Sequence, residues 1–422
     1  MFRSGLAGFV LWLRGDGFDA LLDLLLPLSL LTLRLEPGQD PTVMVLVLCF
    51  WLTAKLLLRA RFNTLYLVLV GVLLICVSTL IGQTSVSSSP TDLIVFLLAF
   101  AAGVGRSRTQ WRASLWALSL MGVVALMLFH WKHDSNDNLT FLAEWVPLSP
   151  LLESVGRIAA IAINRSAYLL GLVVLCCWSL FRFGGRGLQK AVSAVLLLLA
   201  YALAVLTGSR AGAWLPILVI VLIEVLWHWR LRVKVVAVSV AILALSALLC
   251  VLIYLPGSPL AYRNLSDAGR AEVAHCFLAK SVQSPSALMV GYGGDVVSLA
   301  CKSETRNPRI IASGLTHAHN VFLQILADNG LICVVGLVAL LFVALRNGLA
   351  MLVAGDAVQG SIALGSALFF VGFGLIESTL IHVLLQQVLA GYLLSASWSS
   401  EWSSEWSSER VGRGIAREGQ SV

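Results

Sequence analysis

Residues 188–227 read LQKAVSAVLLLLAYALAVLTGSRAGAWLPILVIVLIEVLW. The stretch contains two long apolar runs, 188–206 and 211–227, which are separated only by a tight turn at 207–210. A helix that crosses a bilayer needs about 20 mostly apolar residues, and each run is close to that length. The stretch therefore predicts two membrane-spanning helices joined by a hairpin turn, and with them an all-α membrane fold.

The composition of the whole chain agrees with these two runs. Of the 422 residues, 59% are apolar and 12% are charged, whereas a soluble globular protein has about 25% charged residues. A soluble fold has too little polar surface to cover so much apolar surface. The net charge of +7 comes from small basic clusters between apolar runs, which is typical of membrane topology and argues against a nucleic-acid partner.

Similar runs elsewhere predict a polytopic protein with about twelve transmembrane helices. The predicted spans are 18–33, 42–58, 64–82, 91–105, 113–130, 166–182, 188–206, 211–227, 234–255, 320–345, 359–376 and 380–396. The chain then divides into helices one to nine (1–256), a long polar loop (257–318), helices ten to twelve (319–396) and a tail (397–422). The tail repeats Trp-Ser-Ser-Glu, which is typical either of a helix with a tryptophan row at the membrane interface or of a disordered segment.

The basic residues of the short loops predict the orientation. They are concentrated in alternate loops, for example at Arg106, Arg182 and Arg346, and in both termini. Because loops rich in arginine and lysine stay on the cytoplasmic side, both termini are predicted to be cytoplasmic. The loop 257–318 is then predicted to lie outside.

The long loop is expected to contain short helices. Ser266-Asp267 can cap a helix that runs through Glu272 toward Lys280, and Gly291-Tyr292-Gly293-Gly294 is typical of a turn. Cys276 and Cys301 also lie in this loop, where an oxidising compartment would permit a disulfide between them. The other six cysteines lie in apolar runs and are interpreted as small hydrophobic residues.

Three arginines on the predicted outer side are candidates for binding an anion. Arg165 lies at the start of a predicted span, Arg210 in the tight turn, and Arg270 on the predicted loop helix. Arginine is always charged, and its planar guanidinium binds phosphate oxygens with two parallel hydrogen bonds. Three arginines around one cavity would suit a pyrophosphate at the membrane surface. The alternative is that each one contacts lipid headgroups.

A second polar cluster, Thr316-His317-Ala318-His319-Asn320, ends the long loop just before a predicted span. Histidine titrates near neutral pH, so it can take a proton from a hydroxyl group. The alternatives are a polar helix cap and a metal site. Two histidines two residues apart do not share one face of a helix, and no acidic cluster accompanies them outside. No metal and no cofactor are therefore predicted.

His319-Asn320, followed after nine intervening residues by Gly330, resembles the signature of the O-antigen ligases and the related Wzy polymerases. The resemblance covers most of the chain, from about residue 40 to 395. The number of twelve spans, with the long loop between the ninth and tenth, also fits the family. Residues 209–214 resemble the family's Ser-Arg turn, Asn164-Arg165 its Asn-Arg segment, and 285–293 its Pro...Gly-x-Gly stretch. The next glycine after Gly330 is Gly336, whereas many members have one sooner.

This resemblance implies an inverting, metal-independent glycosyltransferase with a C-type fold in the bacterial inner membrane. The donor would be a glycan on undecaprenyl pyrophosphate, and the acceptor a sugar hydroxyl of lipid A-core, as in lipopolysaccharide biosynthesis. His319 would be the general base, and His317 and Asn320 would orient the base or the acceptor. The three arginines would hold the pyrophosphate: Arg165, Arg210 and Arg270.

Other functions are compatible with parts of the pattern. An O-antigen polymerase and a protein O-oligosaccharyltransferase would share the base and the arginines, although the latter usually has a longer C-terminal periplasmic region. A transporter places charge near the middle of the bilayer, where this chain has few acidic residues: Asp23, Glu224 and Glu377, the last near an outer end. The ligase is favoured by the chain length, the number of spans and the single large loop.

Overall fold

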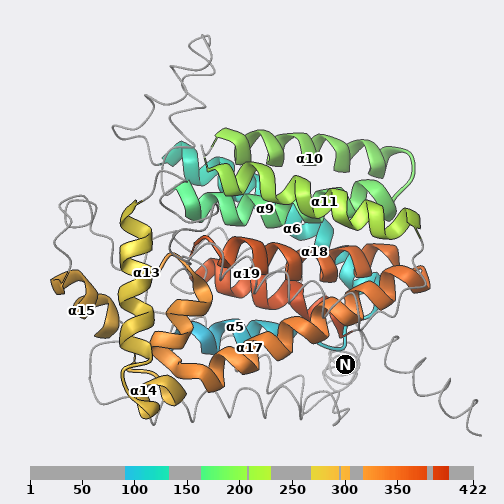
Figure 1. Ribbon diagram of the computed structural model, residues 1–422. Helices are drawn as coiled ribbons and strands as arrows, with labels where there is room; N and C mark the ends of the chain where they lie inside the picture. The colour runs from blue at the N-terminus through green and yellow to red at the C-terminus, as the bar shows by residue number, and fades with distance from the viewer. Residues whose placement is uncertain are drawn as a thin grey trace, which may run out of the picture.

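The structure is a computed structural model of the chain, and it describes residues 91–132, 163–206, 209–229, 268–293, 296–304, 317–377 and 384–398. All regular elements in this part are helical (Figure 1). They are α5 (Thr91–Gly103), α6 (Arg108–Lys132), α9 (Ile163–Ser179), the π-helical turn η1 (Leu180–Gly184), α10 (Leu188–Leu206), α11 (Arg210–Trp229), α13 (Ala268–Ser281), α14 (Pro285–Val290), α15 (Val296–Glu304), α17 (Val321–Ala354), α18 (Ala357–Gly374), α19 (Leu384–Leu394) and the 3-10 turn η4 (Ser395–Ser397).

Five segments of the described part are long and apolar enough to cross a membrane. They are Ala167–Gly184, Leu188–Val205, Ala211–His228, Val321–Ala354 and Ala357–Gly374. The all-α, polytopic membrane class is thereby confirmed, and the hairpin of 188–227 consists of α10 and α11 as predicted. The spans 18–33, 42–58, 64–82 and 234–255 and the tail after Trp398 lie outside the described residues, so the total of twelve stays a prediction.

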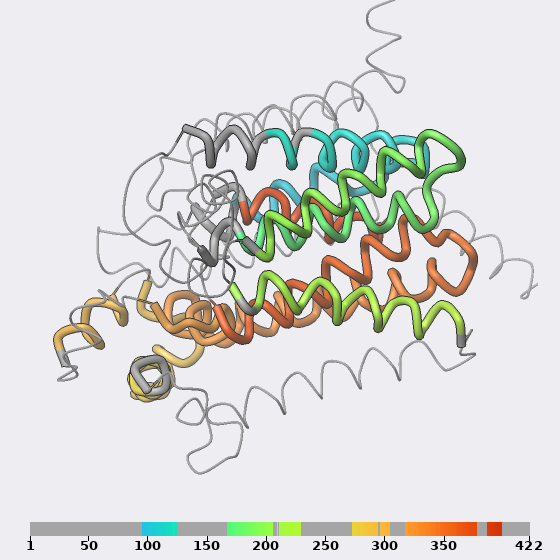
Figure 2. Tube along the Cα trace, turned by 90° about the horizontal axis from the view of Figure 1, so that it is seen from above, coloured from blue at the N-terminus to red at the C-terminus, as the bar shows by residue number. Residues whose placement is uncertain are grey.

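Short connections fold successive helices back on one another. η1 leads from α9 into α10, residues 207–209 separate α10 from α11, and Gly355-Asp356 join α17 to α18. As a result α9, α11 and α17 begin, and α18 ends, at the end of the bundle where α13, α14 and α15 lie (Figures 1 and 2). We call this the loop end; α10 also ends there, where α11 begins. We call the opposite end, with η1 and Gly355-Asp356, the hairpin end.

Glycines allow the close helix packing that a membrane interior favours, where small residues let backbones approach. A methyl group added at Gly171 of α9 would collide with the Phe369 ring of α18, and one at Gly391 of α19 with the backbone of Phe96 in α5. The helices α9 and α18 are mostly buried, whereas α10 and α11 expose strips of apolar side chains such as Leu198 and Leu218. Those strips suit contact with lipid tails.

The helix α17 is longer than predicted. Its 34 residues reach Ala354, whereas the predicted span ends at 345 and places Arg346 in a loop. The prediction of that loop is wrong because a single charge interrupts the apolar run without interrupting the helical period. Leu349 and Leu352, beyond Arg346, are buried, and the helix ends only at Gly355, whose left-handed φ of 95° forms its C-cap.

The loop helices pack on the first turns of α17 through a small apolar cluster of their own. Its buried members are Val273, Phe277, Val297, Cys301, Ala318 and Ala327. A disulfide joins Cys276 of α13 to Cys301 of α15, so the pairing that the sequence permits is present. The predicted helix through Glu272 toward Lys280 is confirmed as α13.

A glycine crossing fixes the end of α14 against α17. Gly291 and Gly330 both have left-handed φ angles, 75° and 78°, which glycine adopts without steric cost. A methyl group on either residue would collide with the backbone of the other segment. The α17 helix is interrupted at Gly330, and the carbonyls of Ala327 and Asp328 accept hydrogen bonds of 2.9 Å from the N–H groups of Tyr292 and Gly293.

Candidate active site

The segment before α17 turns sharply because of its cap. Asn320 is the N-cap of α17, with an extended backbone and a side-chain oxygen that accepts a 3.0 Å hydrogen bond from the Leu323 N–H. His319, the residue before it, has a left-handed φ of 51°. No other non-glycine residue of the described ranges has a positive φ. Such conformations are uncommon, and surrounding structure must hold them in place.

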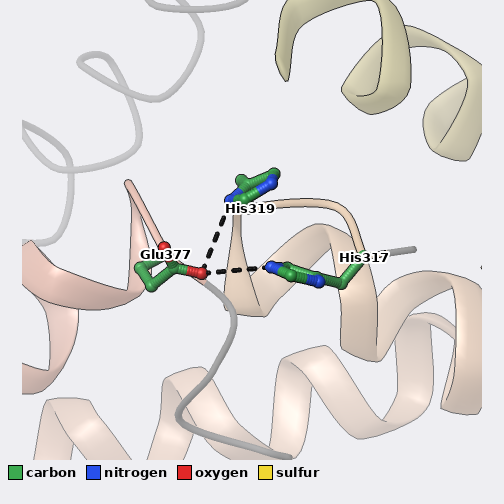
Figure 3. A group of neighbouring side chains, drawn as sticks. All are labelled: His317, His319 and Glu377. Carbon is green, nitrogen blue, oxygen red and sulfur yellow. Dashed lines mark ion pairs between the residues drawn. The ribbon is translucent and has the colours of Figure 1, made fainter. Parts of the chain in front are cut away.

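The turn brings two imidazoles to one carboxylate (Figure 3). Nε2 of His317 lies 3.4 Å, and Nδ1 of His319 3.5 Å, from the same oxygen, Oε1 of Glu377. The two rings are 4.2 Å apart between centroids. The side chains of His319 and Glu377 are 5% and 3% exposed, whereas that of His317 is 26% exposed. A titratable cluster is thus buried at the loop end, with one side reachable from outside.

Glu377 comes from the end of α18. Its N–H donates a 2.9 Å hydrogen bond to the Phe373 carbonyl, which continues the last helical turn. Asn320 connects the two elements, because its side-chain Nδ2 donates to the Leu375 carbonyl at 3.1 Å. One asparagine therefore caps α17 and also holds the residues next to Glu377. This geometry suits the supporting role predicted for Asn320.

A buried polar relay lies on the other side of the histidine turn. The N–H of Ala318, between the two histidines, donates to Oε1 of Gln324 at 2.9 Å, and Nε2 of Gln324 donates to Oδ2 of Asp328 at 2.8 Å. Gln324 is fully buried and Asp328 nearly so. The relay ends where the Asp328 carbonyl accepts the bond from Gly293. The glycine crossing and the histidine turn are therefore parts of one hydrogen-bonded structure.

The histidines change the acidity of Glu377. Burial by itself would raise the pKa of this carboxyl group, because a charge is costly in a low-dielectric environment. The two imidazoles beside it, those of His317 and His319, outweigh burial and lower the pKa of Glu377 well below its usual range. Glu377 is thus a carboxylate at neutral pH.

The three predicted arginines begin helices at or near the same end of the bundle. Arg165 lies in the first turn of α9, Arg210 is the first residue of α11, and Arg270 lies in the first turn of α13. Their side chains lie outside the described part of the structure.

Close packing connects two of these helix starts with the histidine turn. A methyl group on Gly212 of α11 would collide with Ala167 of α9. One on Gly372 of α18 would meet Leu215 of α11, and one on Gly374 would touch Val321 of α17. The backbones that carry Arg165 and Arg210 are therefore connected through α18 to the start of α17, which follows His319.

The three side chains in Figure 3 carry nitrogen and oxygen atoms of the kinds that bind metal ions in proteins. One atom each from His317, His319 and Glu377 lies within 4.8 Å of the others. The prediction of no metal rested on two expectations, that the histidines would not meet and that no acid would join them. Neither expectation is met, because the histidines lie on a turn before the helix and the acid comes from another helix.

Glu377 is the main site residue that the sequence analysis did not assign. It was noted only as an acid near an outer membrane end. Such an acid is costly and often functional, so its position was a usable signal. Asp328 carried the same signal, because an acid inside an apolar helix is costly and its partner Gln324 is four residues earlier on the same helix face.

The fold and the site together define a class: a polytopic helical membrane protein with a buried histidine–carboxylate cluster where a membrane helix begins. Residues 194–341 match a family model described as O-antigen ligase. The matched segment includes Arg210, Arg270, His317, His319 and Asn320, but neither Arg165 nor Glu377. No curated protein sequence matches the chain.

This match over residues 194–341 supports membership of the O-antigen ligase superfamily, which the sequence motifs predicted. Members of this family are ligases and polymerases of the glycosyltransferase type, which supports an enzymatic role in the membrane.

Proposed function

We propose that this protein is an O-antigen ligase. It would transfer a glycan from undecaprenyl pyrophosphate to a sugar hydroxyl of lipid A-core, with inversion at the anomeric carbon and without a metal. The observation that carries the proposal is the buried pair of His319 and Glu377, 3.5 Å apart, at the start of α17. It combines a titratable base with a fixed carboxylate at the position of the family's histidine motif.

His319 would act as the general base. Its Nδ1 faces Glu377, which favours the tautomer that carries a proton on Nδ1 and a lone pair on Nε2. Nε2 then accepts the proton of the acceptor hydroxyl while the hydroxyl oxygen bonds to the sugar C1. The C1–O bond to the pyrophosphate breaks in the same step. Glu377 stabilises the imidazolium that forms, in the way that a buried carboxylate supports a catalytic histidine.

The departing pyrophosphate gains negative charge and needs positive groups nearby. Arg165, Arg210 and Arg270 are proposed for this role, because guanidinium groups bind phosphate oxygens bidentately. Preorganised charge in a site shielded from water is a large contribution to catalysis. Support comes from the packing of the first turns of α9 and α11 beside the end of α18.

The same proposal includes the topology. Twelve spans would cross the inner membrane in 1–256 and 319–396, with both termini and the tail 397–422 in the cytoplasm. The loop 257–318 would lie in the periplasm and carry the acceptor side of the site. The disulfide between Cys276 and Cys301 supports this orientation, because disulfides persist in oxidising compartments.

The test is a transfer assay with purified protein in detergent. Wild type, His319→Ala and His275→Ala would each receive a polyprenyl-pyrophosphate glycan and lipid A-core in the presence of EDTA. His275 is an exposed histidine of α13 and serves as the matched control. Wild type and His275→Ala should modify lipid A-core, and His319→Ala should be slower by about 10²–10⁴-fold, the usual contribution of a general base.

Other products would identify other functions. Longer lipid-linked glycan in place of modified lipid A-core would indicate an O-antigen polymerase, and a modified protein acceptor would indicate a protein O-oligosaccharyltransferase. If folded wild type transfers glycan to no acceptor, the glycosyltransferase proposal is overturned and a transporter becomes the better hypothesis.

A further inference from the structure

The cluster of His317, His319 and Glu377 has the geometry of a first-row transition-metal site. Its two nitrogen–oxygen separations, 3.4 and 3.5 Å, exceed the 2.7–3.2 Å of an ordinary hydrogen bond. Around a tetrahedral zinc ion with bonds of about 2.0–2.1 Å, neighbouring ligand atoms are about 3.3–3.5 Å apart. The two separations therefore fit ligands around an ion better than they fit direct hydrogen bonds, and the third ligand pair lies within 4.8 Å.

The chemistry of the three donors points to the same class of ion. Two imidazoles and one carboxylate form a common protein set for zinc and related divalent ions, whereas magnesium and calcium prefer oxygen ligands. The turn at His319, which has a left-handed φ, brings its ring to the same carboxylate oxygen that His317 faces. The partly exposed His317 side chain provides a route for the ion and for a water molecule as a fourth ligand.

We propose that His317, His319 and Glu377 bind a zinc-class divalent ion, and that this ion inhibits glycan transfer. The binding depends only on the three side chains; the inhibition rests on the proposed function. A neutral imidazole has one lone pair, so an ion on Nδ1 of His319 leaves the ring proton on Nε2. A nitrogen that carries a proton cannot accept one from the acceptor hydroxyl.

Binding is tested with the full chain in detergent, stripped of metal with EDTA and dialysed. Calorimetric titration with Zn²⁺ should show one ion per wild-type chain, and Co²⁺ should give the visible absorption of a tetrahedral site. His317→Gln and Glu377→Gln should each weaken Zn²⁺ binding by about tenfold or more, since even the loss of an outer-shell partner costs 10–100-fold. Thermal melting would verify that both variants are folded.

The matched control is the other histidine–glutamate pair of the described part, His228 and Glu224, whose Nδ1–Oε2 distance is 3.4 Å. It lies at the hairpin end, where the His228 side chain is exposed. His228→Gln should leave Zn²⁺ binding unchanged. The proposal is overturned if wild type binds no Zn²⁺, or if His317→Gln and Glu377→Gln both bind as wild type does, or if His228→Gln removes the binding.

The activity arm separates this inference from the proposed function. Zn²⁺ added at saturation should suppress glycan transfer by wild type, and excess EDTA should restore it. Transfer that is unchanged or stimulated by saturating Zn²⁺ would overturn the inhibitory role. If EDTA-treated wild type transfers nothing, the proposed function fails, while the calorimetric result, measured without any glycan, still decides the metal site.

Discussion

The two ends of the bundle each hold a glutamate between two nitrogen-bearing side chains. At the hairpin end Glu224 lies 2.8 Å from Nε of Arg182 and 3.4 Å from Nδ1 of His228. At the loop end Glu377 lies 3.4 and 3.5 Å from its two histidines. By distance alone, the pair of Glu224 and Arg182 would be the stronger one.

Burial reverses that order. The Glu224 side chain is 25% exposed and that of Arg182 37%, whereas Glu377 is 3% exposed. Exposed ion pairs are screened and contribute little to stability, typically about 0–1 kcal/mol. Arginine also keeps its proton at all relevant pH values, whereas histidine can exchange one. The comparison teaches that a short contact holds helices together, while a buried, exchangeable contact can perform chemistry.

The largest expected effect separates the two glutamates by activity. Glu377→Gln should reduce kcat for glycan transfer by about 100-fold, within the range of a lost acid–base contribution, because the imidazolium loses its carboxylate. Glu224→Gln should change kcat by less than about twofold. Initial rates of both variants at saturating donor measure the difference. Equal losses in the two variants would remove the functional distinction between the two ends.

The second prediction concerns the covalent link at the loop end. Replacing Cys276 and Cys301 by serine removes a disulfide across a sequence separation of 25 residues, worth about 3 kcal/mol for a loop of this size. We expect a lower melting temperature and slower transfer, because α13 and α15 pack on the start of α17.

Reductant provides the control for that variant. It should slow the wild type and have no further effect on the double serine variant. A wild type with two alkylatable thiols in this loop after isolation from membranes would contradict both the link and the predicted periplasmic location.

The third prediction compares two asparagines that each bind a distant carbonyl. Asn320→Ala removes a helix cap and the bond to Leu375, and should cost about 1–3 kcal/mol of stability. It should also reduce kcat more than it raises KM, since Glu377 lies two residues beyond Leu375.

Asn347 is the matched residue for this test, because its Nδ2 donates to the Ser397 carbonyl at 3.2 Å. Asn347→Ala should cost about 1 kcal/mol or less and leave kcat unchanged. Thermal melts and steady-state kinetics of both variants decide the matter, and a normal kcat in Asn320→Ala would show that the asparagine does not position the site.

The smallest expected effect is on acid stability. The pKa of Glu377 is lowered in the folded protein. When the pH falls below about 4.3, the ordinary pKa of glutamate, Glu377 therefore takes up a proton in the unfolded chain but stays ionised in the folded one. The stability that Glu377 contributes is fully present above that pH and decreases below it. Between about pH 6 and pH 3.5, wild type should therefore lose more stability than Glu377→Gln. Parallel melting curves for the two proteins would contradict the lowered pKa.

Much of the fold was predictable from the order of apolar and polar residues. The runs at 188–206 and 211–227 correspond to α10 and α11 almost without change, and Ser266-Asp267 predicted a helix that the structure shows as α13. These features depend on neighbours within a few turns, which a sequence displays directly. The histidine motif was visible for the same reason, since His319 and Asn320 are adjacent and begin a helix.

The sequence by itself determined the membrane class, the helices and the histidine–asparagine turn, because hydrophobic runs and caps act over short separations. Only the tertiary structure decided that Glu377 meets His317 and His319, that Asn320 binds Leu375, and that Gly291 crosses Gly330. Each of these contacts joins residues from different elements, and the antiparallel return of α18 along α17 brings the carboxylate back to the histidines. The periodicity of one helix does not indicate which residues of another helix it contacts, because such contacts depend on how the two helices pack.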